Sequence, residues 1–241
     1  MTGLGTIINS ISIVAGGLIG HFTGKLFKSE QQESLNKVCG VSVLFIGTAG
    51  AMEGMLKING SEISSGKSML VVLCLALGTI LGELIGIENE FEQFGEWLKK
   101  KTGNSGDASF VNAFVTASLT VSIGAMAIVG AIQDGLTGDY STLVVKSVLD
   151  FIIIVVMTSS MGKGAMFSAI PVFAFEGCIT LLAQLVSPVM TQTAIAYLSL
   201  IGSVLIFCVG VNLVWGKKLS VANMLPSVVL AVLAAYLPYN F

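Results

Sequence analysis

The chain has 241 residues, of which 54% are hydrophobic and 11% are charged, and its mean hydropathy is +0.89. Soluble domains are about one-quarter charged, so this composition indicates an integral membrane protein whose first partner is lipid. The net charge is −2 and all twelve basic residues are lysine, so there is no basic field to bind nucleic acid.

Eight apolar runs approach the length of about 20 helical residues that a hydrocarbon core of about 30 Å requires. The first starts directly after Met1 without a cationic leader, which favours a retained span over a removable signal peptide. The last is short and contains Pro226, so seven full spans with one re-entrant or tilted segment is the alternative. We predict an all-α fold, a polytopic transmembrane helical bundle forming a single domain over residues 1–241. The runs cover 4–23, 36–56, 68–87, 110–132, 142–160, 164–186, 194–215 and 222–239.

Two of these runs carry the same glycine ladder, GxxxGxxxG, which gives a helix one smooth face for close approach of another backbone. A helix with an Ile-Gly pair follows each ladder and ends in an acid and a glycine, at Glu53-Gly54 and Asp134-Gly135. This suggests a duplicated hairpin, and a fainter likeness between 38–49 and 200–211 suggests inverted repeats, which are frequent in transporters. A glycine face could equally support a homo-oligomer. The ladders are Gly16, Gly20 and Gly24, and Gly78, Gly82 and Gly86.

The longest polar stretch, 88–107, has Phe91, Phe94, Trp97 and Leu98 at helical spacing ahead of three lysines at 99–101. It is typical of an amphipathic helix at the cytoplasmic interface. A solvated continuation of the third helix is the other interpretation.

Lysine placement predicts the orientation of the bundle. With the N-terminus outside, nine lysines fall in inner loops and only Lys57 and Lys67 fall in outer loops. We therefore expect a multi-pass protein with its N-terminus outside and, for eight spans, its C-terminus outside as well.

Three ionisable residues lie inside predicted spans, where charge is costly and persists mainly beside a partner or water. Lys146 and Asp150 are four residues apart on one helix face, and Glu176 lies near the middle of the next run. The first two could form a purely structural ion pair. Alternatively, Asp150 binds a cation or proton with Lys146 as its counter-ion or competitor, and Asp150 and Glu176 exchange protons in the physiological range.

Pro171 removes a backbone donor in the sixth run, five residues before Glu176 and just after Ser168. Broken helices of this kind expose main-chain oxygens to ions or substrates at membrane depth. The alternative is a kink that only shapes packing.

Other polar residues complete the candidate ion or substrate site, although each could simply hydrogen-bond across helices. Asp134 and Asp139 flank an oxygen-rich outer turn that could concentrate cations. The additional candidates are Asp134, Gln133, Asn9 and Asn212, with Asn112 as a further intramembrane amide.

Enzyme signatures are missing from the sequence, so we expect no enzyme, no cofactor and no metal. His21 is the single histidine, and the four cysteines each lie in an apolar run without a second ligand at metal-binding spacing. Catalytic residues are therefore not assigned.

Several motifs together resemble the YdfK/YqgA-like family of bacterial inner-membrane proteins. The resemblance covers essentially the whole chain, and the block from Asp134 to Asp150 is its most specific part. It implies a compact multi-span α-helical protein of the bacterial inner membrane, and it transfers no substrate, cofactor or catalytic residue. Glu176 departs from the glutamine expected in that family. The motifs are Gly124-Ala-Met-Ala-Ile-Val-Gly130, Asp134-Gly-Leu-Thr-Gly-Asp139, Lys146-Ser-Val-Leu-Asp150, Ser168-Ala-Ile-Pro-Val172 with Glu176-Gly177, and Asn223-Met-Leu-Pro-Ser227.

The leading hypothesis is an ion-coupled secondary transporter of a small solute or cation, with a midplane site on the fifth and sixth runs. A passive channel lined by polar helix faces and a non-transporting membrane scaffold are the alternatives. Neutralising Asp150 should abolish coupled uptake in the first case, whereas a swap of Lys146 and Asp150 should be tolerated in the scaffold.

Overall fold

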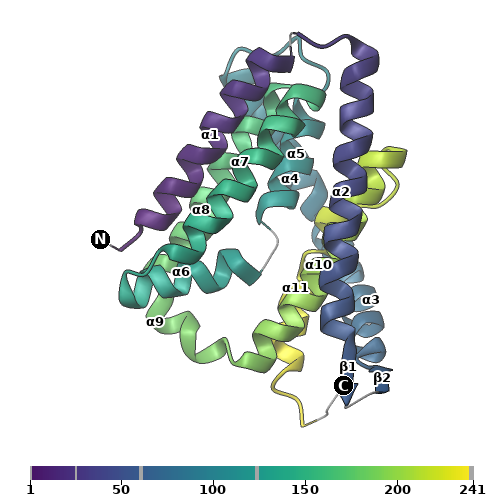
Figure 1. Ribbon diagram of the computed structural model, residues 1–241, viewed down its shortest axis with the longest axis vertical. Helices are drawn as coiled ribbons and strands as arrows, with labels where there is room; N and C mark the ends of the chain where they lie inside the picture. Colours follow the sequence, from purple (N-terminus) through teal and green to yellow (C-terminus); the bar gives the residue numbers. More distant parts are fainter. Residues whose placement is uncertain (1, 25, 60–61, 123–124, 239–241) are drawn as a thin grey trace.

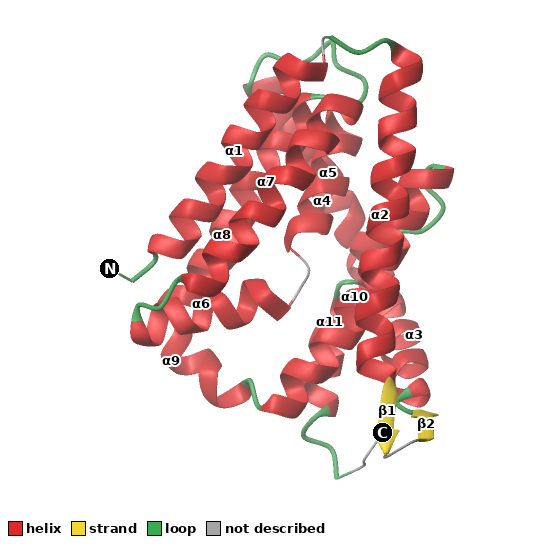
Figure 2. Ribbon diagram, viewed as in Figure 1, coloured by secondary structure: helices red, strands yellow, loops and turns green. Residues whose placement is uncertain are grey.

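A computed structural model describes residues 2–24, 26–59, 62–122 and 125–238, and within them the chain is almost entirely helical (Figures 1 and 2). A two-stranded antiparallel hairpin, in which Leu56 pairs with Ser65, joins the second helix to the third. The elements are α1 (Leu4–Gly24), α2 (Ser29–Met55), β1 (Leu56–Asn59), β2 (Glu62–Ser65), α3 (Ser68–Ile85), α4 (Ile87–Lys101), α5 (Phe110–Ser122), α6 (Ala125–Thr137), α7 (Ser141–Met161), α8 (Ala169–Leu181), α9 (Ala183–Val186), α10 (Gln192–Trp215), α11 (Pro226–Ala234), and the 3-10 helices η1 (Lys163–Ser168), η2 (Ser187–Val189) and η3 (Val221–Met224).

The all-α polytopic bundle expected from the sequence is confirmed. Among the described residues, six helices are long and apolar enough to cross a membrane, or seven if α5 and α6 count as one span. The last predicted run forms the shorter apolar segment Val221–Ala234, in which Pro226 is the first residue of α11. Pro is tolerated there because the first helical N–H groups have no intrahelical partner.

The predicted run 110–132 is interrupted, because the axes of α5 and α6 differ by 62°. The Val121 carbonyl, which a continuing helix would pair with an N–H four residues later, accepts a hydrogen bond from Lys146 Nζ at 2.8 Å. The Ile123-Gly124 pair of the proposed repeat lies outside the described residues.

Two groups of helices make up the bundle (Figure 1). One group contains α1, α6, α7 and α8, and the other contains α2, α3, α10 and α11, while α5 contacts both α7 and α10. Large apolar side chains such as Phe45 and Leu84 remain exposed on the outside, as expected for a surface that lipid covers.

The first glycine ladder lets α1 lie directly on the backbone of α7, parallel to it. An added Cβ at Gly16 would lie 2.7 Å from the Phe151 carbonyl oxygen, and one at Gly20 would lie 2.5 Å from that of Val155. Gly24 repeats this approach with Ser159. The ladder therefore packs within the chain, and its face is not free for a second copy.

Only the first two glycines of the second ladder lie close to another backbone. Gly78 lies against Ser227 and Gly82 against the Asn223 carbonyl, so α3 packs on η3 and α11. Gly86 does not belong to the predicted packing face, because an added Cβ at this position would meet nothing within 4 Å. Its φ of 74° instead makes it the left-handed cap of α3, where its N–H reaches Gly82 O.

Helices α2 and α10, which contain the two segments of the fainter sequence likeness, pack antiparallel on each other. Added Cβ atoms at Gly47 and Gly54 would lie 2.5 Å from Phe207 N and 2.9 Å from Leu200 Cβ. The inverted repeat itself stays a prediction.

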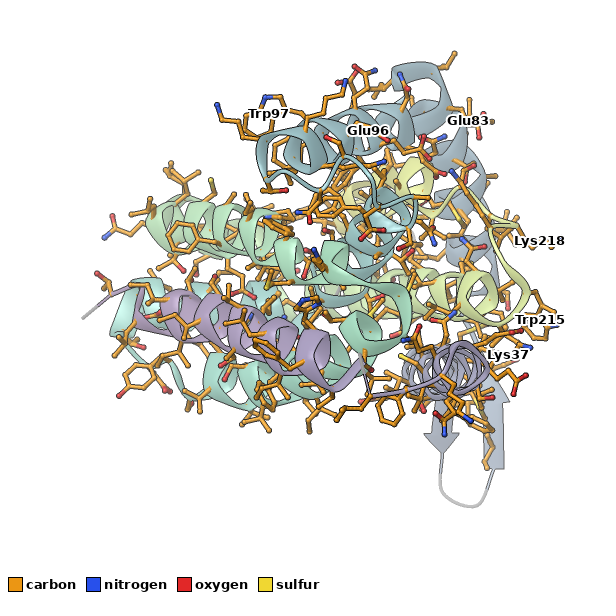
Figure 3. All side chains as sticks on the ribbon, turned by 90° about the horizontal axis from the view of Figure 1, so that it is seen from above. Lys37, Glu83, Glu96, Trp97, Trp215 and Lys218 are labelled. Atoms are coloured by element: carbon orange, nitrogen blue, oxygen red, sulfur yellow. The ribbon has the colours of Figure 1, made fainter. Side chains whose placement is uncertain are left out.

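Helix α4 occupies most of the predicted amphipathic stretch. Leu98 is buried beside Phe110 and Phe114 of α5, while Phe94 and Trp97 stack outside with ring centroids 5.8 Å apart. Figure 3 shows Trp97 at the outer edge of α4. Lys101 Nζ lies over the Trp97 ring. An apolar inner face, an outer face with aromatic side chains and a neighbouring lysine are typical of a helix at a membrane surface.

Candidate functional site: a buried ionic cluster

Three ionisable side chains meet in the protein interior between α7, α8 and the end of α5. Lys146 Nζ contacts Asp150 Oδ2 on the next turn of α7, and it lies 3.5 Å from Glu176 Oε1 of α8. Their exposed fractions are 6% for Lys146, 4% for Asp150 and 0% for Glu176. The residues singled out from the sequence as intramembrane charges thus form one cluster.

Helix α1 supplies the fourth member. Asn9, which is completely buried, donates from Nδ2 to Glu176 Oε1 at 2.9 Å. One turn closer to the start of α1, the Thr6 and Thr180 hydroxyls lie 3.3 Å apart. Polar contacts therefore follow the α1–α8 interface.

The end of α5 completes the cluster with a main-chain oxygen. Lys146 Nζ has three donor positions, and Val121 O, Asp150 Oδ2 and Glu176 Oε1 surround it. A carbonyl freed by a helix break at membrane depth is an ion-binding element of discontinuous transporter helices.

The cluster contains polar atoms without a hydrogen-bond partner. Glu176 Oε2 and Asn9 Oδ1 both have none. A buried polar atom without a partner costs about 1–3 kcal/mol, so these two acceptors are an unfavourable feature of the cluster that needs an explanation.

Asp134 does not lie in an oxygen-rich outer turn, which is where the sequence predicts it. It is fully buried, and its two carboxylate oxygens accept from Gly3 N at 3.1 Å and Gly5 N at 2.9 Å. It therefore caps the start of α1 from α6 instead of facing an outer turn with Asp139. Asp139 is exposed and accepts from the Ser141 backbone N–H, which lowers the pKa of Asp139.

Pro171 does not break a helix in the way expected. It is the third residue of α8, in the first turn, where a missing N–H removes no helical hydrogen bond. The change of geometry in this run lies earlier, where η1 gives way to α8 at Ser168, and the strong break of the chain lies between α5 and α6 instead. Ser168 is completely buried.

Two further candidates serve the packing of the chain away from the cluster. Gln133 Oε1 accepts from Thr142 Oγ1 at 2.7 Å and so connects α6 to α7. Asn212 Oδ1 accepts from the N–H groups of Lys218 and Leu219, which fixes the loop after α10.

A polar hollow opens at the end of the bundle that carries most lysines, which Figure 3 views from above. Its volume is about 570 Å³, and Thr116 and Leu119 form its wall along α5. A neighbouring hollow of about 530 Å³ shares Asn36 and Asn112 with it. Because Leu119 is two residues before Val121, the hollow reaches along α5 to within a turn of the cluster.

One ion-pair group stands at the rim of the larger hollow. Lys217 Nζ lies 2.6 Å from Glu88 Oε1 and 2.6 Å from Glu92 Oε1, and these two carboxylates raise the pKa of Lys217. The loop after α10 is thereby connected to α4.

Sequence reasoning missed the Val121 carbonyl and the break that follows it. The available signal was the polar series Ser118, Thr120 and Ser122 inside an apolar run. Hydroxyl side chains in a membrane helix commonly hydrogen-bond backward along their own helix, as Thr120 does to Thr116 O, so this signal is weak.

A bundle of apolar helices around a buried ionic cluster defines the chain as a multi-pass α-helical membrane protein. It belongs to the family described as "Protein of unknown function (DUF554)", whose model matches residues 4–236.

Two relatives match nearly the full length of the chain. It is 27% identical over 237 residues to "Uncharacterized membrane protein YdfK" of Bacillus subtilis (strain 168), covering 98% of this chain and 97% of the relative. It is 25% identical over 232 residues to "Uncharacterized protein YqgA" of Escherichia coli (strain K12), covering 95% and 94%. The family resemblance found from the motifs is therefore confirmed. No solved structure matches the chain.

Proposed function

We propose that this protein is an ion-coupled secondary transporter of a small solute or cation, located in the bacterial inner membrane. The observation that supports this best is the meeting of Lys146, Asp150, Glu176 and Asn9 beside the end of α5. Ionisable groups at membrane depth are costly, and they mark ion or substrate pathways in transport proteins.

The surroundings of the cluster support the same function. A helix interrupted beside a buried binding group is a recurrent transporter feature, and α5 and α6 have this arrangement. The hollow along α5 extends from the lysine-rich end toward the cluster. The cluster itself is closed to that hollow by protein, as expected of a state in which the bound site is occluded.

Lys146 has a specific role in this proposal. As an ammonium tethered between two carboxylates, it occupies the position that a transported or coupling cation would take. Movement of Lys146 Nζ away from Asp150 Oδ2, with its hydrogen bond to Val121 O retained, would free Asp150 for that cation, so the lysine acts as an internal competitor.

Flux through proteoliposomes tests the proposal. The purified protein is reconstituted with a trapped pH-sensitive dye, and flux is measured after addition of a panel of alkali cations, amino acids and carboxylic acids under imposed gradients. We expect saturable, gradient-dependent flux with the unmodified chain and its loss with Asp150→Asn. Asp139→Asn is the matched control, because it removes an exposed carboxylate and should leave flux unchanged.

Three results would count against the proposal. Current without saturation in planar bilayers would favour a channel, and wild-type flux in correctly inserted Asp150→Asn would remove Asp150 from the mechanism. A stable protein with no flux for the whole panel would make the cluster structural.

A further inference from the structure

Asn9 and Glu176 form one hydrogen bond, and one further polar atom on each side chain has no partner. Asn9 Nδ2 donates to Glu176 Oε1 at 2.9 Å, while the other oxygen of each group, Asn9 Oδ1 and Glu176 Oε2, has no partner. Both residues have an exposed fraction of 0%. The two atoms without partners therefore belong to the same pair of side chains, in a place without contact to bulk solvent.

The chemistry of these two groups explains the missing bond. An ionised carboxylate has only acceptors, so it can accept from the amide N–H but can offer nothing to the amide oxygen. A carboxylic acid has one O–H donor. If Glu176 Oε2 carries that proton, it can donate to Asn9 Oδ1, and acid and amide form two hydrogen bonds in a ring. One proton on Glu176 Oε2 would therefore give both Glu176 Oε2 and Asn9 Oδ1 a hydrogen-bond partner.

The charges around Glu176 favour the same proton. Lys146 contacts Asp150 closely and lies 3.5 Å from Glu176, so one ammonium faces two carboxylates. The three groups would have a net charge of −1 if all were ionised, and an uncompensated buried charge is strongly unfavourable.

No other described charge facing Glu176 supplies the missing positive charge. Helix α1 contributes Asn9, α5 contributes the Val121 carbonyl, and α6 contributes Asp134, which is held by the start of α1. In η1, Lys163 Nζ donates instead to Asn104 Oδ1 at 3.0 Å. The positive charge must therefore come from outside the protein.

We propose that Glu176 is a proton-binding site in which Oε2 carries a proton and donates to Asn9 Oδ1, so that the coupling ion of this protein is the proton. Hydronium transfers its proton to the Glu176 carboxylate and leaves as water, and the reverse step returns the proton to water when α1 and α8 separate. This inference rests on the proposed transport function for its use, although proton binding itself is measurable without transport.

Glu176→Gln is informative because it imitates the protonated state. The glutamine Oε1 can accept from Asn9 Nδ2, and its Nε2–H can donate to Asn9 Oδ1 in place of the acid O–H. We expect this variant to fold and insert like the unmodified protein and to have lost proton-coupled flux.

Infrared spectroscopy of the protein in lipid at neutral pH provides the direct test. We expect the C=O absorption of a protonated carboxylic acid, shifted by ¹³C-labelled glutamate and missing in Glu176→Gln. Isotope labelling assigns the band to glutamate without any mutation, which keeps the test valid if a variant fails to fold. Asn9→Leu should move the band to the frequency of a non-hydrogen-bonded acid. Asp150→Asn should weaken or remove the band, because Lys146 is then left with Glu176 as its single carboxylate partner.

The outcomes separate this inference from the transport proposal. A glutamic acid band without flux would support the proton site and contradict transport. Flux driven by Na⁺, together with absence of the band, would support transport and overturn the proton site. Loss of the band on titration with Na⁺ or K⁺ would assign the atoms without partners to a metal cation and would also overturn the inference.

Discussion

At the scale of single residues, Asp134 shows how a carboxylate in one helix can stabilise the start of another. Its acceptors receive two N–H groups from the first residues of the chain, and α1 has no acidic residue of its own in its first turn. The partial positive charge of a helix N-terminus adds a favourable electrostatic contribution to these bonds.

Replacement of Asp134 by alanine should loosen the beginning of α1. Loss of an N-cap costs about 0.5–2 kcal/mol, so amide exchange in the first turn should become about 2- to 30-fold faster. Hydrogen–deuterium exchange with mass spectrometry measures this. Asp139→Ala is the control, because its carboxylate binds Ser141 on an exposed turn and should leave α1 unchanged. Equal acceleration by both variants would argue against the capping role.

The sequence identified the charged members of the cluster but not their arrangement. Lys146 and Asp150 are neighbours on one helix, so their contact follows from helical spacing. Asn9 and Glu176 are 167 residues apart. Their hydrogen bond depends on how α1 packs on α8, and no local pattern in a single sequence contains that information.

At the scale of helices, the glycine ladders determine which elements touch. The ladder of α1 places Gly20 so close to the Val155 carbonyl oxygen that an added Cβ would lie 2.5 Å away. A carbon atom so close to a carbonyl oxygen is a steric clash, so α1 and α7 would have to move apart.

A methyl group at this position should therefore destabilise the bundle. Overpacking of this kind costs about 1–3 kcal/mol, and in a chain of this size each kcal/mol lowers Tm by about 2–4 °C. Thermal unfolding of Gly20→Ala in detergent, compared with Gly106→Ala, gives the measurement. An added Cβ at Gly106 would meet nothing within 4 Å, so its Tm should stay close to that of the unmodified chain. Equal values of Tm for the two variants would contradict close packing of α1 on α7.

Sequence patterns predicted helices well and their interruptions poorly. Apolar runs mark α1, α2, α3, α7 and α10 because lipid requires long apolar segments with internally satisfied backbones. The break after α5 depends on Lys146, 25 residues later, which holds Val121 O. Pro171 is the opposite case. The sequence predicts a helix break at this proline, but in the first turn of α8 a proline has little effect on the helix.

At the scale of the whole molecule, the ends of the elements separate into two sides. Gly3 lies beside Asp134 near one end of α6, and Tyr236, just beyond α11, donates to Val189 O in η2. Figure 1 shows the start of α1 near mid-height and α9 and α11 in the lower half, all away from the loop between α1 and α2. The predicted topology, in which both termini are outside, stays a prediction.

Labelling of single cysteines tests the orientation. In a Cys178→Ser background, which removes the exposed native thiol, Asp139→Cys should react with an impermeant maleimide in intact spheroplasts. Lys100→Cys should react only after permeabilisation, because the lysine-rich loops are expected inside. The reversed pattern would invert the topology.

The partnership of Asn9 with Glu176 also has a consequence for biosynthesis. Ribosomes add about 5–20 residues per second, so roughly 8–33 s separate the emergence of these two side chains, which are 167 positions apart. During this interval α1 resides in the bilayer or the translocon with the side-chain amide of Asn9 unsatisfied. A nascent chain arrested before residue 176 should therefore be the form of this protein that insertion chaperones and membrane proteases recognise most readily.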